Sequence, residues 1–245
     1  MNALVITLWA EPPLTLPIDY NSTVQGALYA CWREKFPALH DQGFSSGHKT
    51  FRMFTFSPLL GASVIKEDRI SFLGAITLEV RSISSELVDA LAGHLILHRV
   101  LRLGKRDLPV VDLRSADRLI FQPSTTIHAV APITVHRTID RRTVYYSPFD
   151  KMFSTLLCDN LKSKLRAAGR DDDVTLVCRP VNGTIREISA QFRETKIVGY
   201  SGDFLVAADS SSTEFLYYTG IGDRNSQGFG MFEILNEPSN YGNRH

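Results

Sequence analysis

The sequence predicts an α+β protein in which the element order β-α-β-β-α-β occurs twice, the pattern of tandem ferredoxin-like (RRM-like) domains. Two observations support this prediction. The length of 245 residues suits one large domain or two small ones. Segments with strand and helix periodicity also follow one another in the same order in each half. We expect an N-terminal domain over residues 1–116 and a C-terminal domain over residues 117–245.

The composition narrows the class of protein. Hydrophobic residues make up 44% and charged residues 22% of the chain, which excludes wholly disordered and low-complexity proteins. The formal net charge of +1 means that a polyanion would have to bind local basic patches. The three cysteines are odd in number and widely spaced, so we expect no disulfide framework, no cysteine zinc site and a reducing, cytoplasmic compartment. No apolar run approaches the roughly 18 residues of a membrane span.

The first half contains one complete set of elements. Residues 4–9 are apolar on both alternating faces, as in a strand that is covered on both sides. An apolar stripe over residues 22–36 predicts a helix, which ends there because Pro37 disfavours the helical conformation of its predecessor. The remaining elements are strands over 50–57 and 70–80, a helix with Ser85 as its N-cap, and an extended hairpin over 101–113 that turns at Gly104.

The second half repeats this set. Residues 125–138 are strand-like and follow a connector over 114–124. The strongest helix signal has Ser147 as its cap and Pro148 in the first helical position, and it ends at Gly169. The remaining elements are strands over 174–179, 185–195 and 196–207, a short helix with a capping box of Ser211 and Glu214, and a last strand over 231–235.

Residues 220–230 form a glycine-rich segment with the pattern G-x-G-x-x-x-x-x-G-x-G, between the last helix and the last strand. Glycine tolerates positive φ angles and close contacts, so such a loop can present backbone amides to phosphate oxygens. Only fifteen residues follow it, too few for the β-α-β unit of a dinucleotide site, and it lacks the lysine of a P-loop. A simple turn is the alternative, but four glycines at this spacing favour combined packing and binding.

This segment resembles the C-terminal glycine-rich loop of the repeat-associated RNA-binding superfamily of CRISPR systems. More narrowly, the chain is similar to the endoribonucleases that process CRISPR precursor RNA. The similarity at the N-terminus lies in an opening strand and in the segments Leu16-Pro17, Tyr20-Asn21, Gln25-Gly26, Leu28-Tyr29, Leu39–Gly43 and Phe54–Ser57. The resemblance spans nearly the whole chain and is weaker in the middle, where residues 131–133 and the helix after Ser147 carry it.

The resemblance implies cleavage of repeat RNA without a metal ion or another cofactor. In that family the 2′-hydroxyl attacks the neighbouring phosphate, and the products carry a 2′,3′-cyclic phosphate and a 5′-hydroxyl. This chemistry needs a group that removes the 2′-hydroxyl proton and a group that protonates the leaving 5′-oxygen. It also needs a cation or hydrogen-bond donors for the charge that develops on the phosphate.

Three residues match the catalytic set that the resemblance implies. His40 lies just beyond the first predicted helix, and an unperturbed histidine pKa of about 6.5 allows it to act as general base or general acid, which the sequence leaves open. Tyr29 matches an assisting tyrosine, and an unperturbed pKa of about 10 favours hydrogen bonding to the nucleophile or the phosphate over proton removal. Lys49 would stabilise the negative phosphorane, with His48 or Arg52 as alternatives.

Candidate RNA-binding residues lie in basic stretches and in the glycine-rich segment. Residues 136–142 offer arginines suited to bidentate phosphate contacts. A second basic group lies at the end of the long helix and comprises Lys162, Lys164, Arg166 and Arg170. Favourable interaction with the helix dipole explains these residues as well as RNA binding does. The sequence leaves open whether Phe229 stacks on a base or packs the loop onto the sheet. The predicted RNA-binding residues are Arg52, Arg137, Arg141, Arg142, Gly220, Gly222, Gly228, Phe229 and Gly230.

We therefore expect a metal-independent endoribonuclease that cuts CRISPR repeat RNA in the precursor transcript. The alternative is a non-catalytic RNA-binding scaffold subunit of a CRISPR effector complex, which would not need His40, Tyr29 and Lys49 together. A small-ligand enzyme on the same fold is disfavoured because phosphate and metal motifs are missing. The expected partner is repeat RNA in its precursor and processed forms, whereas effector-complex subunits and a second copy of the chain stay open as partners.

Overall fold

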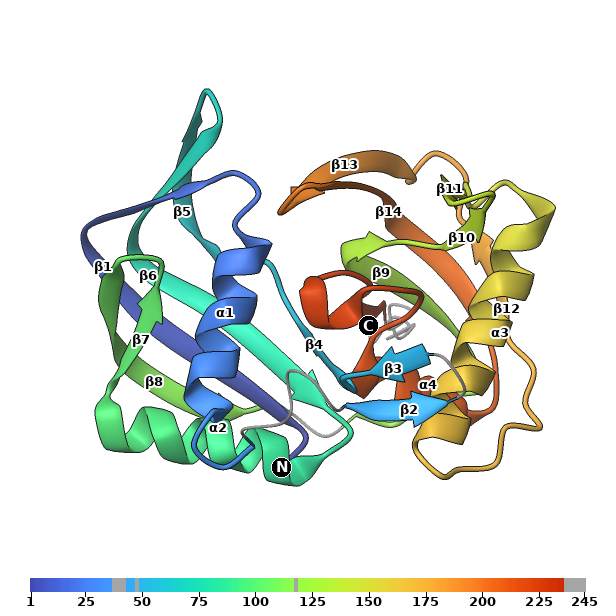
Figure 1. The fold of residues 1–245 in the computed structure, drawn as a ribbon, viewed down its shortest axis with the longest axis horizontal. Helices are drawn as coiled ribbons and strands as arrows, with labels where there is room; N and C mark the ends of the chain where they lie inside the picture. The colour runs from blue at the N-terminus through green and yellow to red at the C-terminus, as the bar shows by residue number, and fades with distance from the viewer. Residues whose placement is uncertain (37–42, 47–48, 117–118, 236–245) are drawn as a thin grey trace, which may run out of the picture.

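A computed structural model describes residues 1–36, 43–46, 49–116 and 119–235 of the chain. Figure 1 shows two β-sheets with their helices, one from each half of the sequence, lying side by side. None of the helices in these residues is long and apolar enough to cross a membrane.

The N-terminal sheet has the strand order β4-β6-β1-β8-β7, and all neighbouring strands are antiparallel. Its strands are β1 (Ala3–Pro17), β4 (Phe54–Phe56), β6 (Arg69–Ser82), β7 (Val100–Leu103) and β8 (Arg106–Ser115). Helices α1 (Asn21–Trp32) and α2 (Ser85–His98) pack on one face of this sheet. Leu4 and Ile6 of β1 point to that face and share one buried core with Leu28 of α1.

Two small strand pairs extend the N-terminal half, and the sequence predicted neither. Strand β5 (Leu60–Lys66) pairs with β6 in a hairpin that projects beyond the sheet (Figure 1). All seven residues of β5 are exposed, so its pairing with β6, and not the burial of an apolar face, holds this strand in place. Strands β2 (Phe44–Ser46) and β3 (Lys49–Phe51) form a separate two-stranded ribbon.

The C-terminal sheet has the strand order β12-β14-β9-β15, again antiparallel, with β13 as a further partner of β14. Its strands are β9 (Ser124–Ile133), β12 (Val177–Pro180), β13 (Arg186–Phe192), β14 (Thr195–Ala207) and β15 (Phe232–Leu235). Helices α3 (Lys151–Ala167) and α4 (Ser210–Thr219) share a second core with this sheet. Strands β10 (His136–Ile139) and β11 (Arg142–Tyr145) form a separate hairpin, and a 3-10 turn, η1 (Asn225–Gln227), lies in the glycine-rich loop.

The two sheets have the same topology. In each one the first strand of the half, β1 or β9, lies between the third and the fourth strand of the β-α-β-β-α-β unit. This order, with both helices on one face, is that of a ferredoxin-like domain, so the predicted α+β fold of two tandem domains is confirmed. The proposed boundary between residues 116 and 117 stays a prediction, because residues 117–118 lie outside the described residues.

A buried arginine joins the two halves. The side chain of Arg81 on β6 is 2% exposed and donates to the carbonyl oxygen of Phe232 at 2.6 Å. Its Nε also donates to Glu79 at 2.6 Å, and its guanidinium lies 3.7 Å from the ring centroid of Tyr217 on α4. Because a buried guanidinium must have its donors satisfied, these contacts favour one arrangement of the two sheets.

The ends of the helices differ from the sequence predictions. Ser84, not Ser85, is the N-cap of α2, and its hydroxyl accepts from a first-turn amide at 3.4 Å. Asp209, not Ser211, caps α4 and accepts from a first-turn amide at 2.8 Å. The long helix α3 begins after Asp150, three residues later than predicted. More than one polar residue that can cap a helix lies within three positions at each site, and the direction of the incoming chain selects among them.

Two predicted strands are broken. The strand predicted over residues 50–57 divides into β3 and β4 because the backbone turns at Met53, which has a φ of 54°. The strand predicted over residues 125–138 divides between β9 and β10. Both breaks lie next to the glycine-rich loop. Strand β4 contacts η1 of the loop, and the carbonyl oxygen of Thr134, between β9 and β10, accepts from the Asp223 amide at 2.9 Å.

Candidate functional site

A polar cavity of about 160 Å³ lies between the N-terminal half and the glycine-rich loop. The turn between β3 and β4 lines one side of it, and residues 224–227 of the loop line the other. Three cationic side chains, those of Arg52, Lys164 and Arg224, are among the lining residues, and no carboxylate is. A cavity with this lining favours an anion, because cations lower the energy of a negative charge and no carboxylate lines the cavity.

Tyr29 lies beside this cavity. It follows Leu28 on α1, and its ring packs edge-on against Trp32 at 6.2 Å and Phe54 at 5.8 Å between centroids. The hydroxyl is hydrogen-bonded to Arg52 and Ser226. Burial raises the pKa of Tyr29, although the guanidinium of Arg52 opposes the rise. The hydroxyl is therefore neutral near pH 7 and suited to hydrogen bonding rather than to removing a proton.

Of the other predicted catalytic residues, only the backbone of Lys49 is described. It begins β3, opposite Ser46 of β2, and β3 leads directly to Arg52. His40 and the alternative His48 lie outside the described residues. Gly43, three residues after His40 in the chain, is in the described part and lies against Arg52, since a Cβ atom on it would be 2.6 Å from a guanidinium nitrogen.

The four glycines of the loop are buried, and each has a φ between 73° and 83°. The amides of Gly220, Gly228 and Gly230 donate to carbonyl oxygens of the protein at 2.7 to 3.0 Å. These three amides are therefore not free to bind a phosphate, whereas the sequence had suggested that the loop would present its amides to phosphate oxygens. A Cβ atom on Gly230 would overlap the carbonyl oxygen of Ile221, and one on Gly222 would be 2.5 Å from the carbonyl oxygen of Thr134. The glycines shape the loop, and residues between them face the cavity.

Lys164 of α3 holds the loop from the C-terminal side. Its side chain is 2% exposed, and its amine donates to the carbonyl oxygens of Gly220 at 2.8 Å and Gly222 at 3.1 Å, and to Asn225 Oδ1 at 2.6 Å. Burial lowers the pKa of Lys164 to about 7, although the carboxylate of Asp223 opposes this. From the N-terminal side, Gln25 of α1 donates to the carbonyl oxygen of Ser226 at 2.6 Å.

Asp223 links the loop to the β10–β11 hairpin. One carboxylate oxygen accepts from the His136 amide at 3.0 Å and lies 2.8 Å from His136 Nδ1, and the other accepts from Asn160 at 2.8 Å. Burial alone would raise the pKa of Asp223, but the contacts with His136 and the charge of Lys164 hold it below its usual range. The carboxylate is therefore ionised at neutral pH and used within the protein.

Comparison with known proteins finds a family match in the C-terminal half. Residues 115–234, which include the second sheet and the glycine-rich loop, match the family model of the CRISPR associated protein Cas6, C-terminal. The C-terminal half of this chain is therefore similar to that family. No curated protein matches the chain in sequence.

Solved structures with the Cas6 fold resemble the whole chain. A structure described as a RAMP protein binding different RNA substrates is 19% identical, with a TM-score of 0.82, over 96% of this chain and 100% of its own. A structure described as CRISPR associated protein Cas6 is 20% identical, with a TM-score of 0.80, over 96% and 99%. A Cas6-related protein from Pyrococcus furiosus is 17% identical, with a TM-score of 0.81, over 96% and 99%. At these identities the likeness establishes the fold.

The predicted basic residues of this chain have different environments. Arg141 and Arg142 are exposed on the β10–β11 hairpin, and Arg137 is exposed with a nitrogen 3.8 Å from the carboxylate of Asp159. In the second basic group, Lys164 is buried beneath the loop, as described above. Arg166 of that group pairs with Asp172. The hairpin is therefore the more exposed basic surface of the two.

Phe229 is 1% exposed and packs with Phe192 and Ile197. Of the two roles that the sequence left open, the structure shows packing, and the ring is not available on the surface for stacking. Arg224 of the loop also lines the cavity, although it was not among the predicted site residues. The signal in the sequence that could have indicated it is a positive charge within the glycine-rich segment.

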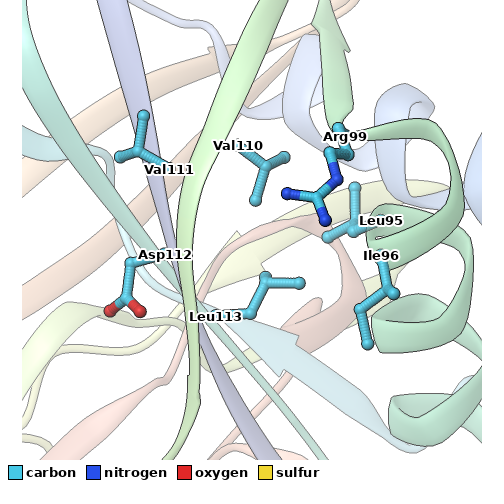
Figure 2. Close-up of a pocket in the computed structure, with 7 residues that line it drawn as sticks. All are labelled: Leu95, Ile96, Arg99, Val110, Val111, Asp112 and Leu113. Carbon is cyan, nitrogen blue, oxygen red and sulfur yellow. The ribbon is translucent and has the colours of Figure 1, made fainter.

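Another groove, of about 210 Å³, lies at the outer edge of the N-terminal sheet between α2 and β8. Figure 2 shows Val110 and Leu113 directed into it, toward Leu95 and Ile96, whereas Asp112 points away. None of the predicted catalytic or RNA-binding residues lines this groove. It therefore does not contribute to the candidate site.

Proposed function

We propose that this chain is a metal-independent endoribonuclease that cuts CRISPR repeat RNA in the precursor transcript. The observation that carries the proposal is the cationic cavity, where Arg52 of the N-terminal half meets Arg224 and Ser226 of the glycine-rich loop. The hydroxyl of Tyr29 lies beside it, hydrogen-bonded to Arg52 and Ser226. It brings together donors and cations suited to an RNA phosphate. The match of residues 115–234 to the Cas6 C-terminal family model, and the likeness of the whole fold to a RAMP protein described as binding different RNA substrates, support it.

The proposed reaction uses the RNA as its own nucleophile. The 2′-hydroxyl loses its proton to a base, its oxygen bonds to the adjacent phosphorus, and the bond from phosphorus to the 5′-oxygen breaks. The leaving oxygen then takes a proton from an acid. His40 is the proposed base or acid, and Tyr29 orients the phosphate or the nucleophile through its neutral hydroxyl. Lys49, with Arg52 beside Tyr29, stabilises the charge that develops on the phosphorane.

The exposed arginines of the β10–β11 hairpin are the proposed contacts for the rest of the repeat RNA. A folded RNA is recognised mainly through its shape and its phosphates, which suits Arg137, Arg141 and Arg142 at a surface. Asp223 ties this hairpin to the glycine-rich loop, so RNA bound along both elements would be placed relative to the cavity. We also propose a cytoplasmic location, and effector-complex subunits or a second copy of the chain as further partners.

The direct test is cleavage of the cognate CRISPR repeat RNA by the purified protein in the presence of EDTA. Cleavage is expected to persist and to give a 2′,3′-cyclic phosphate and a 5′-hydroxyl. A single 2′-deoxy substitution at the nucleotide before the cut should abolish cleavage, because it removes the nucleophile, while binding is retained. Cutting of the deoxy substrate at the normal site would instead indicate an activated water molecule.

The alternative function is a non-catalytic RNA-binding scaffold subunit of an effector complex. The glycine-rich loop and the basic hairpin fit this function as well as they fit a nuclease. The hydrogen bonds that join Tyr29 to Arg52 and Ser226, both of which line the cavity, favour the nuclease. Tight binding of repeat RNA with no cleavage under any of these conditions would decide for the scaffold.

The arginines of the cavity are expected to contribute to RNA binding. Arg52→Ala and Arg224→Ala should each weaken binding about tenfold at physiological salt and reduce the dependence of log affinity on log salt by about one, the effect of losing one phosphate contact. Equilibrium binding measured over a salt series gives both values. Arg114→Ala is the matched control, because Arg114 is exposed on β8 of the N-terminal sheet. Equal loss in the control would mean that general charge, not the cavity, binds the RNA.

A further inference from the structure

We propose that Lys164 is a positioning residue that holds the glycine-rich loop so that Arg224 faces the cationic cavity. The identity of the ligand as an RNA phosphate rests on the proposed function. The role of Lys164 rests on contacts within the protein, which join two segments that lie 56 to 61 residues apart in the sequence.

The amine of Lys164 is fully used by the loop. An ammonium group has three N–H donors, and all three acceptors, two backbone carbonyl oxygens and Asn225 Oδ1, belong to residues 220–225. The group is buried, so water does not compete for these donors. Lys164 lines the cavity without a donor to spare for a phosphate. This arrangement indicates that the lysine acts on the loop rather than directly on a ligand.

The contact with Asn225 matters because Arg224 precedes it in an unfavourable backbone conformation. Arg224 has a φ of 59°, a left-handed conformation that residues with a Cβ atom avoid. Asn225 is held on its other side as well, since its amide group donates to the carbonyl oxygens of Ile221 at 3.1 Å and Phe229 at 3.0 Å. Fixing Asn225 at both ends of its side chain keeps the strained backbone of Arg224 in place.

The side chain of Arg224 shows why this conformation would be useful. Its Nη1 donates to Gln227 at 3.3 Å, while its Nε is buried and has no hydrogen-bond partner among the described residues. A buried guanidinium nitrogen without an acceptor is unfavourable unless a ligand supplies one. A phosphate in the cavity would provide acceptor oxygens. Strain at Arg224, maintained by Lys164, would thus be part of the preparation of the anion site.

A double-mutant cycle tests whether Lys164 acts through Arg224. Lys164→Met keeps the length of the side chain and removes its donors, and it should weaken binding of repeat RNA about tenfold, as Arg224→Ala does. Because both changes remove the same contact, the double variant should bind no more weakly than Arg224→Ala alone. Losses that multiply to about a hundredfold would show that Lys164 only stabilises the fold, and would overturn the proposal. Lys162→Met is the matched control, since it lies about 200° around α3 from Lys164 and should bind like the wild type.

A second measurement needs no RNA and separates this inference from the proposed function. Hydrogen exchange of the Gly228 and Gly230 amides should become faster in Lys164→Met than in Lys162→Met or the wild type. Lys164→Arg keeps charged donors and should restore slow exchange and RNA binding.

If the wild-type protein binds no repeat RNA, the proposed function fails and the exchange data still decide the role of Lys164. If Lys164→Met does not fold, Lys164→Arg decides, and a folded Lys164→Arg protein with fast loop exchange would overturn the inference.

Discussion

Replacing His40 with alanine is expected to slow cleavage of repeat RNA by about 10²- to 10⁴-fold, the usual contribution of a general acid or base. RNA binding should change little, because the imidazole is assigned to proton transfer. Single-turnover cleavage with saturating protein separates the two effects. His128→Ala is a suitable control, since His128 lies on β9 and pairs with Asp203 at 2.6 Å, outside the cavity lining. An unchanged rate in His40→Ala would remove His40 from the mechanism.

The same variant can decide which proton His40 transfers. A substrate with sulfur in place of the leaving 5′-oxygen does not need a general acid, because a thiolate is a good leaving group. If His40 is the acid, His40→Ala should cleave this substrate almost as fast as the wild type does. If His40 is the base, the defect should persist with both substrates. The two outcomes settle the role that the sequence leaves open.

Replacing Gly230 with alanine is expected to lower the free energy of unfolding by about 3 kcal/mol or more and to abolish RNA binding. The left-handed conformation at φ 73° accounts for about 1–2 kcal/mol of this loss. The rest arises because the added Cβ atom would overlap the carbonyl oxygen of Ile221 and lie 2.6 Å from Asn225 Nδ2, so the loop must open. Urea unfolding followed by fluorescence measures the change.

Gly169 provides the control for backbone strain alone. It has a φ of 67° at the end of α3, and a Cβ atom there would meet nothing within 4 Å. Gly169→Ala should therefore lose only about 1–2 kcal/mol and keep its RNA affinity. If the two variants were equally stable, close packing of the loop would not be the reason for its glycines.

The fold could be predicted well because its signals are local. Residues 4–9 and the helical stripes carry their periodicity within a few residues, and the order of the elements follows from reading them along the chain. The glycine-rich segment was recognisable for the same reason. The exact N-cap residues could not be predicted. At α2, for example, Ser84 and Ser85 are chemically alike, and the path of the chain decides which of them caps the helix.

The candidate site was harder to predict, because its contacts join distant segments. Lys164 looks like the other basic residues near the end of α3, yet it alone among them is 2% exposed and bonded to the loop. Phe229 could equally have stacked or packed until its neighbours Phe192 and Ile197 were placed beside it. Arg52 was expected as an RNA-binding residue or as an alternative to Lys49, but its hydrogen bond to Tyr29, which lies on a different element, was not predicted.

The linear chain therefore specified the repeated element order, the positions where glycine is needed, and the kinds of chemical group available. Those features depend on the conformational preferences of neighbouring residues, which are independent of the rest of the molecule. Three-dimensional packing selected which cations line the cavity, which lysine is buried beneath the loop, and which groups Tyr29 contacts. Burial and hydrogen bonding depend on what lies nearby in space, and residues 29, 52, 164 and 224 meet only when the two sheets pack together.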